Sequence, residues 1–195
     1  MSRDEQLALF GFGDGPDGPE GFRYQPELVS ADEERELVGQ IEGLPFANFQ
    51  FHGHEGKRRV VSFGWRYDFE GRGLVRADDV PAFLMPLRAR AAALAGFEPA
   101  SFQHVLVTEY APGTGIGWHR DKPEFDEVVG VSLGSGCDFR FRRRSGARWE
   151  RRTVPLAARS AYLLSGPART AWEHSILAVP RLRYSVTFRN VRADR

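Results

Sequence analysis

Residues 183–189 read Arg-Tyr-Ser-Val-Thr-Phe-Arg, a strict alternation of polar and apolar side chains that predicts a β-strand. Successive side chains of a strand point to opposite faces, so one face of this segment is apolar and suited to a core. The other face carries Arg183, Ser185, Thr187 and Arg189. If this polar face turns to solvent, its two arginines are ordinary surface residues. If it lines the interior of a barrel, two buried cations require anions.

Other short segments with strand character precede this one, and turn signals separate most of them. They cover residues 104–110, 127–133, 138–143, 150–156, 161–164 and 171–175. Two helices are predicted before them. Ser30 and Glu33 form a capping box that opens a helix running to about residue 42, and helical spacing of leucines predicts another helix from residue 81 or 84 to 94. This order predicts an α+β, mainly β fold, with a double-stranded β-helix (jelly roll) or barrel core and the N-terminal helices packed outside.

A β-hairpin is predicted between the two helices. Residues 46–52 and 57–67 alternate around the four-residue turn 53–56. In this prediction, one face of the second strand carries Phe63, Trp65 and Tyr67.

The composition predicts one domain in a reducing compartment. We expect residues 1–20, which are rich in glycine and proline, to form a loose arm, and residues 21–195 to form a single domain. Cys137 is the only cysteine, so no internal disulfide can form. No apolar stretch is long enough to span a membrane, and we expect a cytoplasmic monomer without a membrane partner.

Positive charge is concentrated in one segment, although the net charge is only +1. Its arginines are Arg140, Arg142, Arg143, Arg144, Arg148, Arg151 and Arg152. The segment is suited to following a phosphate backbone. A solvated hairpin on a strand-rich surface explains it equally well.

Candidate metal ligands lie at His119-Arg120-Asp121 and at His174. The His-x-Asp motif alone is weak, but it follows a glycine-rich loop, and His174 ends an aromatic segment just before the arginine strand. Two imidazoles and one carboxylate leave three positions of Fe(II) open, enough for a chelating keto acid and dioxygen. Arg183 and Arg189 would then pair with the carboxylates of a dicarboxylate cosubstrate, because a guanidinium binds a carboxylate through two hydrogen bonds.

These motifs resemble those of the AlkB-like family of Fe(II)- and 2-oxoglutarate-dependent dioxygenases, over about residues 21–192. The family signature Arg-x-Asn-x-Thr-x-Arg matches residues 183–189, with Ser185 in place of asparagine, and Asn-x-Tyr-x-x-Gly matches residues 108–113, with Thr108 in place of asparagine. The resemblance implies iron ligands that are also the catalytic centre: His119, Asp121 and His174. It implies a 2-oxoglutarate site formed by Arg183, Arg189, Tyr110, Thr108 and Ser185. We expect the two departures to alter the geometry of cosubstrate binding without abolishing it.

The resemblance also implies an activity, the oxidative demethylation of N-alkylated DNA or RNA bases of the dealkylation-repair type. Oxygen and 2-oxoglutarate are consumed, and succinate, carbon dioxide and formaldehyde are released. Residues 57–64 are similar to a lid segment of the family, so the hairpin is expected to be a lid and Arg58 to contact substrate. Aromatic residues that would stack on a base are Phe51, Phe63, Trp65 and Tyr67, unless they form hairpin core. Pro123 replaces the family's acidic base-reading residue, so Glu124 or Asp126 would have to substitute for it.

Two other functions remain open from the sequence. An AlkB-like oxygenase that acts on a protein side chain fits the nearly neutral charge. A non-catalytic jelly-roll binding module with structural histidines is the second alternative.

Overall fold

The computed structural model describes residues 17–51, 54–68 and 73–192, and in these ranges the chain is built mainly from antiparallel strands. The larger sheet, which we call the major sheet, has the order β1 (Phe22–Gln25), β11 (Ala161–Leu164), β8 (Phe125–Leu133), β13 (Arg183–Val191), β6 (His104–Tyr110), β3 (His54–Phe63) and β2 (Ala47–Phe51). The minor sheet has the order β10 (Arg148–Leu156), β9 (Cys137–Ser145), β12 (Glu173–Ile176) and β7 (Ile116–His119). A separate ribbon pairs β4 (Trp65–Asp68) with β5 (Gly73–Arg76).

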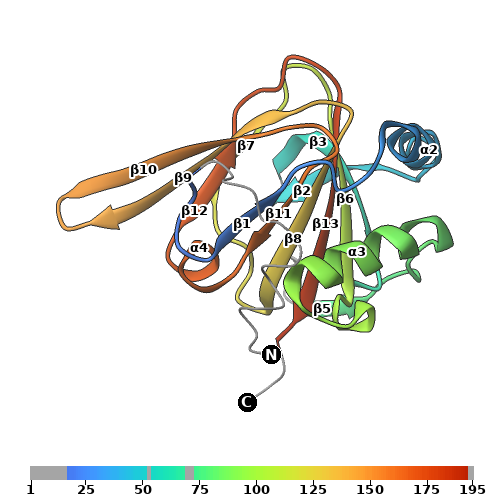
Figure 1. The fold of residues 1–195 in the computed structure, drawn as a ribbon, viewed down its shortest axis with the longest axis horizontal. Helices are drawn as coiled ribbons and strands as arrows, with labels where there is room; N and C mark the ends of the chain where they lie inside the picture. The colour runs from blue at the N-terminus through green and yellow to red at the C-terminus, as the bar shows by residue number, and fades with distance from the viewer. Residues whose placement is uncertain (1–16, 52–53, 69–72, 193–195) are drawn as a thin grey trace.

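Both predicted helices form and cover one face of the major sheet (Figure 1). Helix α2 (Ala31–Ile41) begins with the predicted capping box: Ser30 Oγ accepts from the Glu33 amide, and the Glu33 carboxylate accepts from the Ser30 amide. Helix α3 (Met85–Ala95) follows the 3₁₀ turn η1 (Ala82–Leu84) and ends at Gly96, whose φ is +76°. A second 3₁₀ turn, η2 (Pro99–Ser101), leads into β6.

Two apolar cores result from this layering. The first lies between the helices and the major sheet, and it contains the apolar face of β13 with Tyr184, Val186 and Phe188. The second lies between the two sheets and is aromatic, with Phe139, Phe141, Tyr162 and Trp172. The prediction of a mainly β jelly roll with helices outside is confirmed.

The predicted strand 57–67 is wrong in its second half. Gly64 breaks it with φ +73°, and a Cβ at this position would lie 2.1 Å from the carbonyl oxygen of Gln103. β3 therefore ends at Phe63, and Trp65 begins β4 in another sheet, so the two residues do not share a face. The predicted turn is also shorter, because Phe51 pairs with His54, and residues 52–53 between them lie outside the described residues.

Other differences are smaller. The predicted strand 171–175 begins only at Glu173, because residues Gly166–Thr170 form the short helix α4. Most of the expected N-terminal arm lies outside the described residues, but the carbonyl of Glu20 accepts a hydrogen bond from the Ala168 amide. None of the described helices has both the length and the apolar character needed to cross a bilayer.

Candidate active site

The two histidines of the candidate metal site lie side by side on adjacent strands of the minor sheet. His119 on β7 pairs in register with His174 on β12, and their ring centroids are 4.3 Å apart. Asp121 follows the end of β7, and its Oδ2 lies 3.6 Å from Nε2 of His174. The Asp121 and His174 side chains are only 6% and 8% exposed. The structure thus brings together all three residues that the sequence predicts as ligands.

Their protonation states suit a metal site. Burial, together with the neighbouring His119, lowers the pKa of His174 to about 3, and burial lowers the pKa of His119 as well. The Gly117 carbonyl lies 2.9 Å from Nδ1 of His119, so Nδ1 carries the proton and Nε2 presents its lone pair. Burial raises the pKa of Asp121, but the positive Arg189 and the two histidines outweigh it, and the pKa falls well below the ordinary value. Two neutral imidazoles and one carboxylate are the forms that bind a metal.

The spacing of these donors is slightly wider than in a closed coordination sphere. Two ligand atoms that are each about 2.1 Å from a metal lie about 3 Å apart at a right angle, whereas Asp121 Oδ2 and His174 Nε2 are 3.6 Å apart. Accordingly, the described residues hold no three His, Cys, Asp or Glu side chains already gathered at coordinating distances. By its chemistry the donor set fits Fe(II), because imidazole nitrogens and a carboxylate oxygen are ligands of this metal, and binding would draw Asp121 Oδ2 and His174 Nε2 closer together.

Arg183 provides the second half of the site. It is fully buried, and its Nη2 donates to Ser132 Oγ at 2.8 Å. Its Nε and Nη1 have no hydrogen-bond partner among the described residues. A buried cation with two unused donors is costly unless an anion joins it. The polar face of β13 therefore lines the interior of the fold, and the solvent-facing alternative is excluded.

The other predicted cosubstrate residues surround Arg183. Tyr110 pairs in register with it across β6 and β13, and its ring centroid lies 5.1 Å from the guanidinium carbon. Thr108 and Ser185 pair with each other on the same two strands, and both are buried. These side chains share the face of the major sheet that looks toward the minor sheet.

Arg189 differs from Arg183 in that its guanidinium is already paired. Its Nε and Nη2 lie 2.8 and 2.7 Å from Oδ1 of Asp121, and its Nη1 lies 3.3 Å from Nδ1 of His104. Oδ2 of Asp121 is left facing His174. One carboxylate can therefore bind a metal through Oδ2 and a guanidinium through Oδ1.

The predicted substrate residues are divided between different parts of the fold. Arg58 lies on β3, stacks over the Phe49 ring at 3.8 Å, and is close enough to Tyr110 and His119 to affect the pKa of each. Phe63 lies on the opposite face of β3 and is 5% exposed in the core beneath the helices, so it cannot stack on a base in the pocket. The structure therefore corrects the prediction of Phe63 as a substrate residue. Successive residues of a strand point to opposite faces, and Phe63 lies on the face that packs under the helices.

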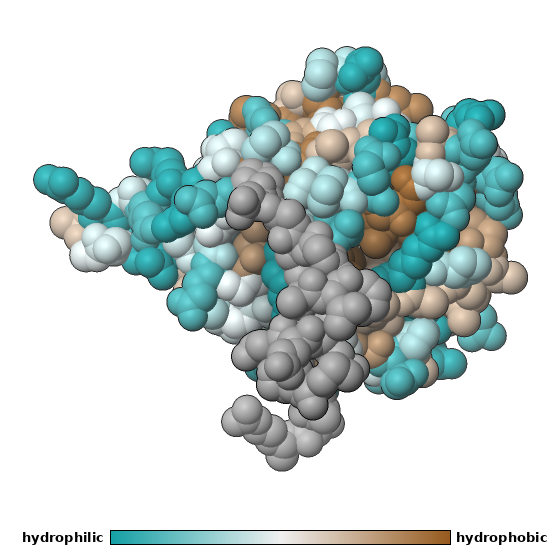
Figure 2. Space-filling model, viewed as in Figure 1, coloured by the Kyte–Doolittle hydropathy of each residue, from teal (hydrophilic) through white to brown (hydrophobic). Residues whose placement is uncertain are grey.

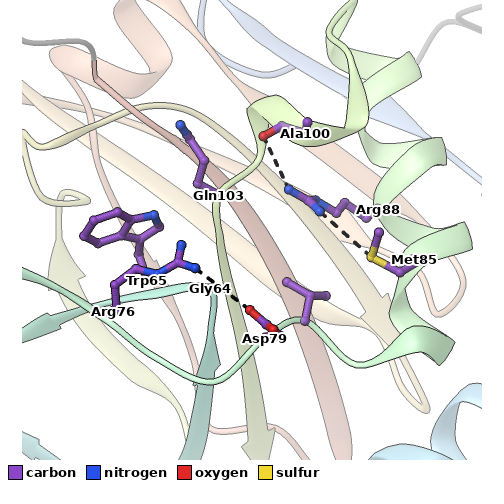
Figure 3. A pocket seen from close by; sticks show the side chains of 9 residues that line it. Gly64, Trp65, Arg76, Asp79, Met85, Arg88, Ala100 and Gln103 are labelled. Carbon is purple, nitrogen blue, oxygen red and sulfur yellow. Dashed lines mark hydrogen bonds and ion pairs between the residues drawn. The ribbon is translucent and has the colours of Figure 1, made fainter.

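Trp65 lies in a different groove, between β4, β5 and α3. Figure 3 shows this groove, which is lined by Gly64, Trp65, Arg76, Asp79, Val80, Met85, Arg88, Ala100 and Gln103. None of the three candidate ligands lines it.

Glu124 lies three residues after Asp121, and its buried Oε2 has no hydrogen-bond partner among the described residues. Tyr67 lies near the site, with Lys122 Nζ 4.5 Å from its ring centroid, whereas the Phe51 side chain lies outside what the structure describes.

Two residues near Asp121 were not predicted from the sequence. Arg169 of α4 is 7% exposed, and its Nη2 donates at 2.6 Å to the carbonyls of both Lys122 and Phe125, which fixes the segment after Asp121. His104 is buried against Arg189 and the Phe125 ring. No sequence motif marks either residue, because their contacts join segments far apart in the chain.

A jelly roll with a His-x-Asp and distant His set beside a buried arginine defines a mononuclear non-haem iron oxygenase. The chain belongs to the 2OG-Fe(II) oxygenase superfamily, whose family model matches residues 22–190. Membership makes it a 2-oxoglutarate-dependent dioxygenase domain whose cofactor and cosubstrates are Fe(II), 2-oxoglutarate and dioxygen, and its sequence is similar to those of proteins named as AlkB homologues.

Comparison with individual proteins agrees with this family. The chain is 27% identical over 180 residues to the "Alkylated DNA repair protein ALKBH8 homolog" of Arabidopsis thaliana, and the match covers 80% of this chain and 50% of the relative. The solved structure of OsALKBH1 superimposes with a TM-score of 0.67 at 17% identity, covering 87% of this chain and 96% of that one. A prolyl-4-hydroxylase of Pseudomonas putida has a TM-score of 0.61 at 16% identity, covering 89% and 94%. The chain thus spans half the length of the plant relative, and the two structures show the fold alone.

Proposed function

We propose that the enzyme oxidatively demethylates N-alkylated bases of DNA or RNA. The observation that carries the proposal is the likeness to a relative named as an alkylated-DNA repair protein, over 80% of this chain. The non-catalytic alternative leaves two observations unexplained: Arg183 is a buried guanidinium with two unused donors, and burial keeps the imidazole of His174 neutral.

In this proposal His119, Asp121 and His174 hold Fe(II) and form the catalytic centre. Fe(II) held there would activate dioxygen, which is the oxidant: one oxygen atom would enter 2-oxoglutarate as it is oxidised to succinate and carbon dioxide, and the other would hydroxylate the N-methyl group, which is then lost as formaldehyde. Arg189 keeps the Asp121 carboxylate in place through Oδ1, because a partner that orients a metal ligand maintains the affinity of the site.

Arg183 anchors the distal carboxylate of 2-oxoglutarate with its free Nε and Nη1 donors. Tyr110, Thr108 and Ser185 line the same face, and their hydroxyl groups offer hydrogen bonds to the cosubstrate. Arg189 is the second cationic anchor, at the iron end of the cosubstrate, because it sits against the ligand Asp121. Burial of these groups excludes water and strengthens each charge interaction.

For the substrate, Arg58 and Glu124 are the proposed contacts that remain. Arg58 faces the pocket beside Tyr110 and His119, and Glu124 has an unused buried oxygen three residues after Asp121. A carboxylate oxygen can accept a hydrogen bond from an exocyclic amine of a base. Trp65 would contact a flanking nucleotide rather than the target base, since its groove lacks the candidate ligands.

Formaldehyde release tests the proposed substrate class. The enzyme with Fe(II), 2-oxoglutarate and air is offered methylated nucleosides, methylated oligonucleotides and methylated peptides. Formaldehyde in amounts equal to succinate from an oligonucleotide is the expected result. Formaldehyde released only from the peptides would contradict the proposal and would indicate a protein side chain as the substrate.

The expected setting is part of the same proposal. We place the protein in the cytoplasm as a monomer with one folded domain over residues 21–195, since its single cysteine, Cys137, favours a reducing compartment. Light scattering coupled to gel filtration measures the oligomeric state.

A further inference from the structure

The hairpin of β9 and β10 projects away from the body of the protein (Figure 1). β9 pairs with β12 only from Phe139 to Arg142, whereas its pairing with β10 continues to Ser145 and Arg148. The end of the hairpin is therefore a ribbon of two strands, closed by Gly146 at φ +59°. A two-stranded ribbon gains little stability from packing. The reason for the length of this hairpin must therefore be sought in the side chains that it carries. Figure 2 shows that the surface of this projection is strongly hydrophilic.

One face of this hairpin carries several arginines beside a tryptophan, Trp149. The cross-strand pairs Arg142 with Arg151 and Arg144 with Trp149 place four of these side chains on one face. The complete set, which we call the arginine–tryptophan face, consists of Trp118, Arg140, Arg142, Arg144, Trp149 and Arg151. It is the outer face of the minor sheet, because Trp118 alternates with the inward-facing His119 on β7.

The guanidinium groups on this face are held over indole rings. The Arg142 guanidinium carbon lies 4.6 Å from the Trp118 ring centroid and 4.4 Å from that of Trp149. The corresponding distance from Arg144 to Trp149 is 5.0 Å. Cation–π contacts of this kind restrict flexible arginine side chains. The guanidinium groups of Arg140, Arg142 and Arg144 are therefore oriented before any ligand arrives.

The positive charge of this face is not neutralised within the described residues. Arg142 pairs with Glu173 at 2.6 Å, but Arg144 and Arg151 are exposed and have no carboxylate partner in the described part of the chain. Arg142 and Arg151 lie directly opposite each other, an arrangement that destabilises a sheet because the charges repel. A bound polyanion would remove this repulsion.

We propose that the arginine–tryptophan face binds the sugar-phosphate backbone of a single-stranded nucleic acid, with Arg144 and Arg151 contacting phosphates. Arg144 and Arg151 are diagonal neighbours across the β9–β10 pair, about 7–8 Å apart, and Arg142 and Arg144 are about 6.7 Å apart along β9, which suits a linear anion with regularly spaced charges. Guanidinium groups bind phosphate oxygens in pairs. β7 is an edge strand of the minor sheet and carries Trp118 outward and His119 inward. A nucleic-acid chain that crosses this edge would therefore pass from the arginine–tryptophan face to the pocket of the candidate ligands. The inference rests on the proposed function and names the surface that holds the substrate outside the catalytic pocket.

Binding measured without turnover tests this surface. The full chain is titrated into a fluorescent, unmethylated single strand of about 20 nucleotides, from about 50 to about 200 mM salt. Relative to wild type, R144Q/R151Q should bind roughly tenfold more weakly and reduce the slope of log K against log salt by about 1.4, because each single-strand phosphate contact contributes about 0.7. Trp149→Ala should weaken binding, and Trp149→Phe should restore most of it. The control is R35Q, an exposed arginine on α2 at the opposite end of the molecule, and it should bind as wild type does.

An unchanged affinity and salt slope in R144Q/R151Q would overturn the proposal. Equal wild-type affinity for polyglutamate or for phosphatidylserine vesicles, lost to the same extent in the double variant, would also overturn it, because the face would then recognise negative charge in general. A methylated trinucleotide is too short to span the arginine–tryptophan face, so its turnover tests the proposed function without this surface. If no methylated nucleic acid is turned over while the variants still lose binding, the proposed function fails and the surface stands.

Discussion

Arg189 and Asp121 form a buried ion pair in which Nη2 of the arginine lies 2.7 Å from Oδ1 of the carboxylate. The same carboxylate turns Oδ2 toward His174. Replacing Arg189 with Met should lower the affinity for the metal about 10- to 100-fold, because the carboxylate loses the partner that orients it. Anaerobic titration with Mn(II) measures this change. The control is Arg192→Gln, which removes an exposed pair with Asp126, and equal Mn(II) affinity in Arg189→Met and wild type would contradict the prediction.

Arg183 should control the binding of 2-oxoglutarate. Arg183→Gln removes the buried charge and most of the donors, and the apparent affinity for 2-oxoglutarate should fall at least about 100-fold, as expected for a lost charge-assisted pair of about 3 kcal/mol or more. Anaerobic titration of the Fe(II) enzyme, followed by the visible charge-transfer band, gives this affinity. Ser132→Ala removes only the hydroxyl that accepts from Nη2 and should have a much smaller effect. A cosubstrate affinity that does not change in Arg183→Gln would remove this residue from the site.

The three candidate ligands should be essential for turnover but not for folding. His119→Ala and Asp121→Ala should abolish succinate formation from 2-oxoglutarate, because two remaining ligands hold Fe(II) weakly. Circular dichroism and thermal unfolding check that the fold is kept. Succinate production that continues in either variant would refute the assignment of that residue as a ligand.

The parts of the fold that were predicted correctly depend on local patterns. The capping box of α2 and the alternation of β13 need only neighbouring residues, and both were predicted close to their observed bounds. The break at Gly64 was missed, because it arises where the carbonyl of the distant Gln103 approaches the backbone. Alternation also could not tell that the polar face of β13 is interior like the apolar one, since that depends on the packing of the minor sheet.

The candidate site shows the same limit. Motifs indicated His119, Asp121 and His174, and the structure brings them together, while their roles as ligands stay predictions. Phe63, a candidate for stacking on a base, lies in the core beneath the helices, which is the alternative that the sequence left open, because alternation alone does not tell which face of β3 packs under the helices. The Arg169 contacts span 44 and 47 residues, so no local pattern could indicate them.

Glu33 should make stability depend on pH at the start of α2. Hydrogen bonds from Arg90 and from the Ser30 amide lower the pKa of Glu33 from 4.5 to about 2. A carboxyl whose pKa is depressed in the folded state stabilises it above the unfolded pKa, and this contribution is lost as the pH falls through about 2. The free energy of unfolding of wild type should exceed that of Glu33→Gln at pH 7, and the gap should shrink between about pH 4.5 and pH 2. Urea unfolding measures both, with Glu36→Gln on the same helix as control, and a gap independent of pH would contradict this origin.

Arg169 should act by holding the segment that follows Asp121. Its Nη2 donates to the carbonyls of Lys122 and Phe125, and both acceptors lose their partner in Arg169→Met, which keeps the length of the side chain. Hydrogen bonds from a charged donor contribute about 1.5–3 kcal/mol each, so the free energy of unfolding should fall by about 3–6 kcal/mol when both are lost. If the segment also fixes Asp121, Mn(II) affinity should fall while the affinity for 2-oxoglutarate, set by Arg183 on another sheet, changes little. Arg169→Lys can still reach one carbonyl and should recover part of the stability. Loss of stability with unchanged Mn(II) affinity would show that Arg169 supports the fold without positioning Asp121.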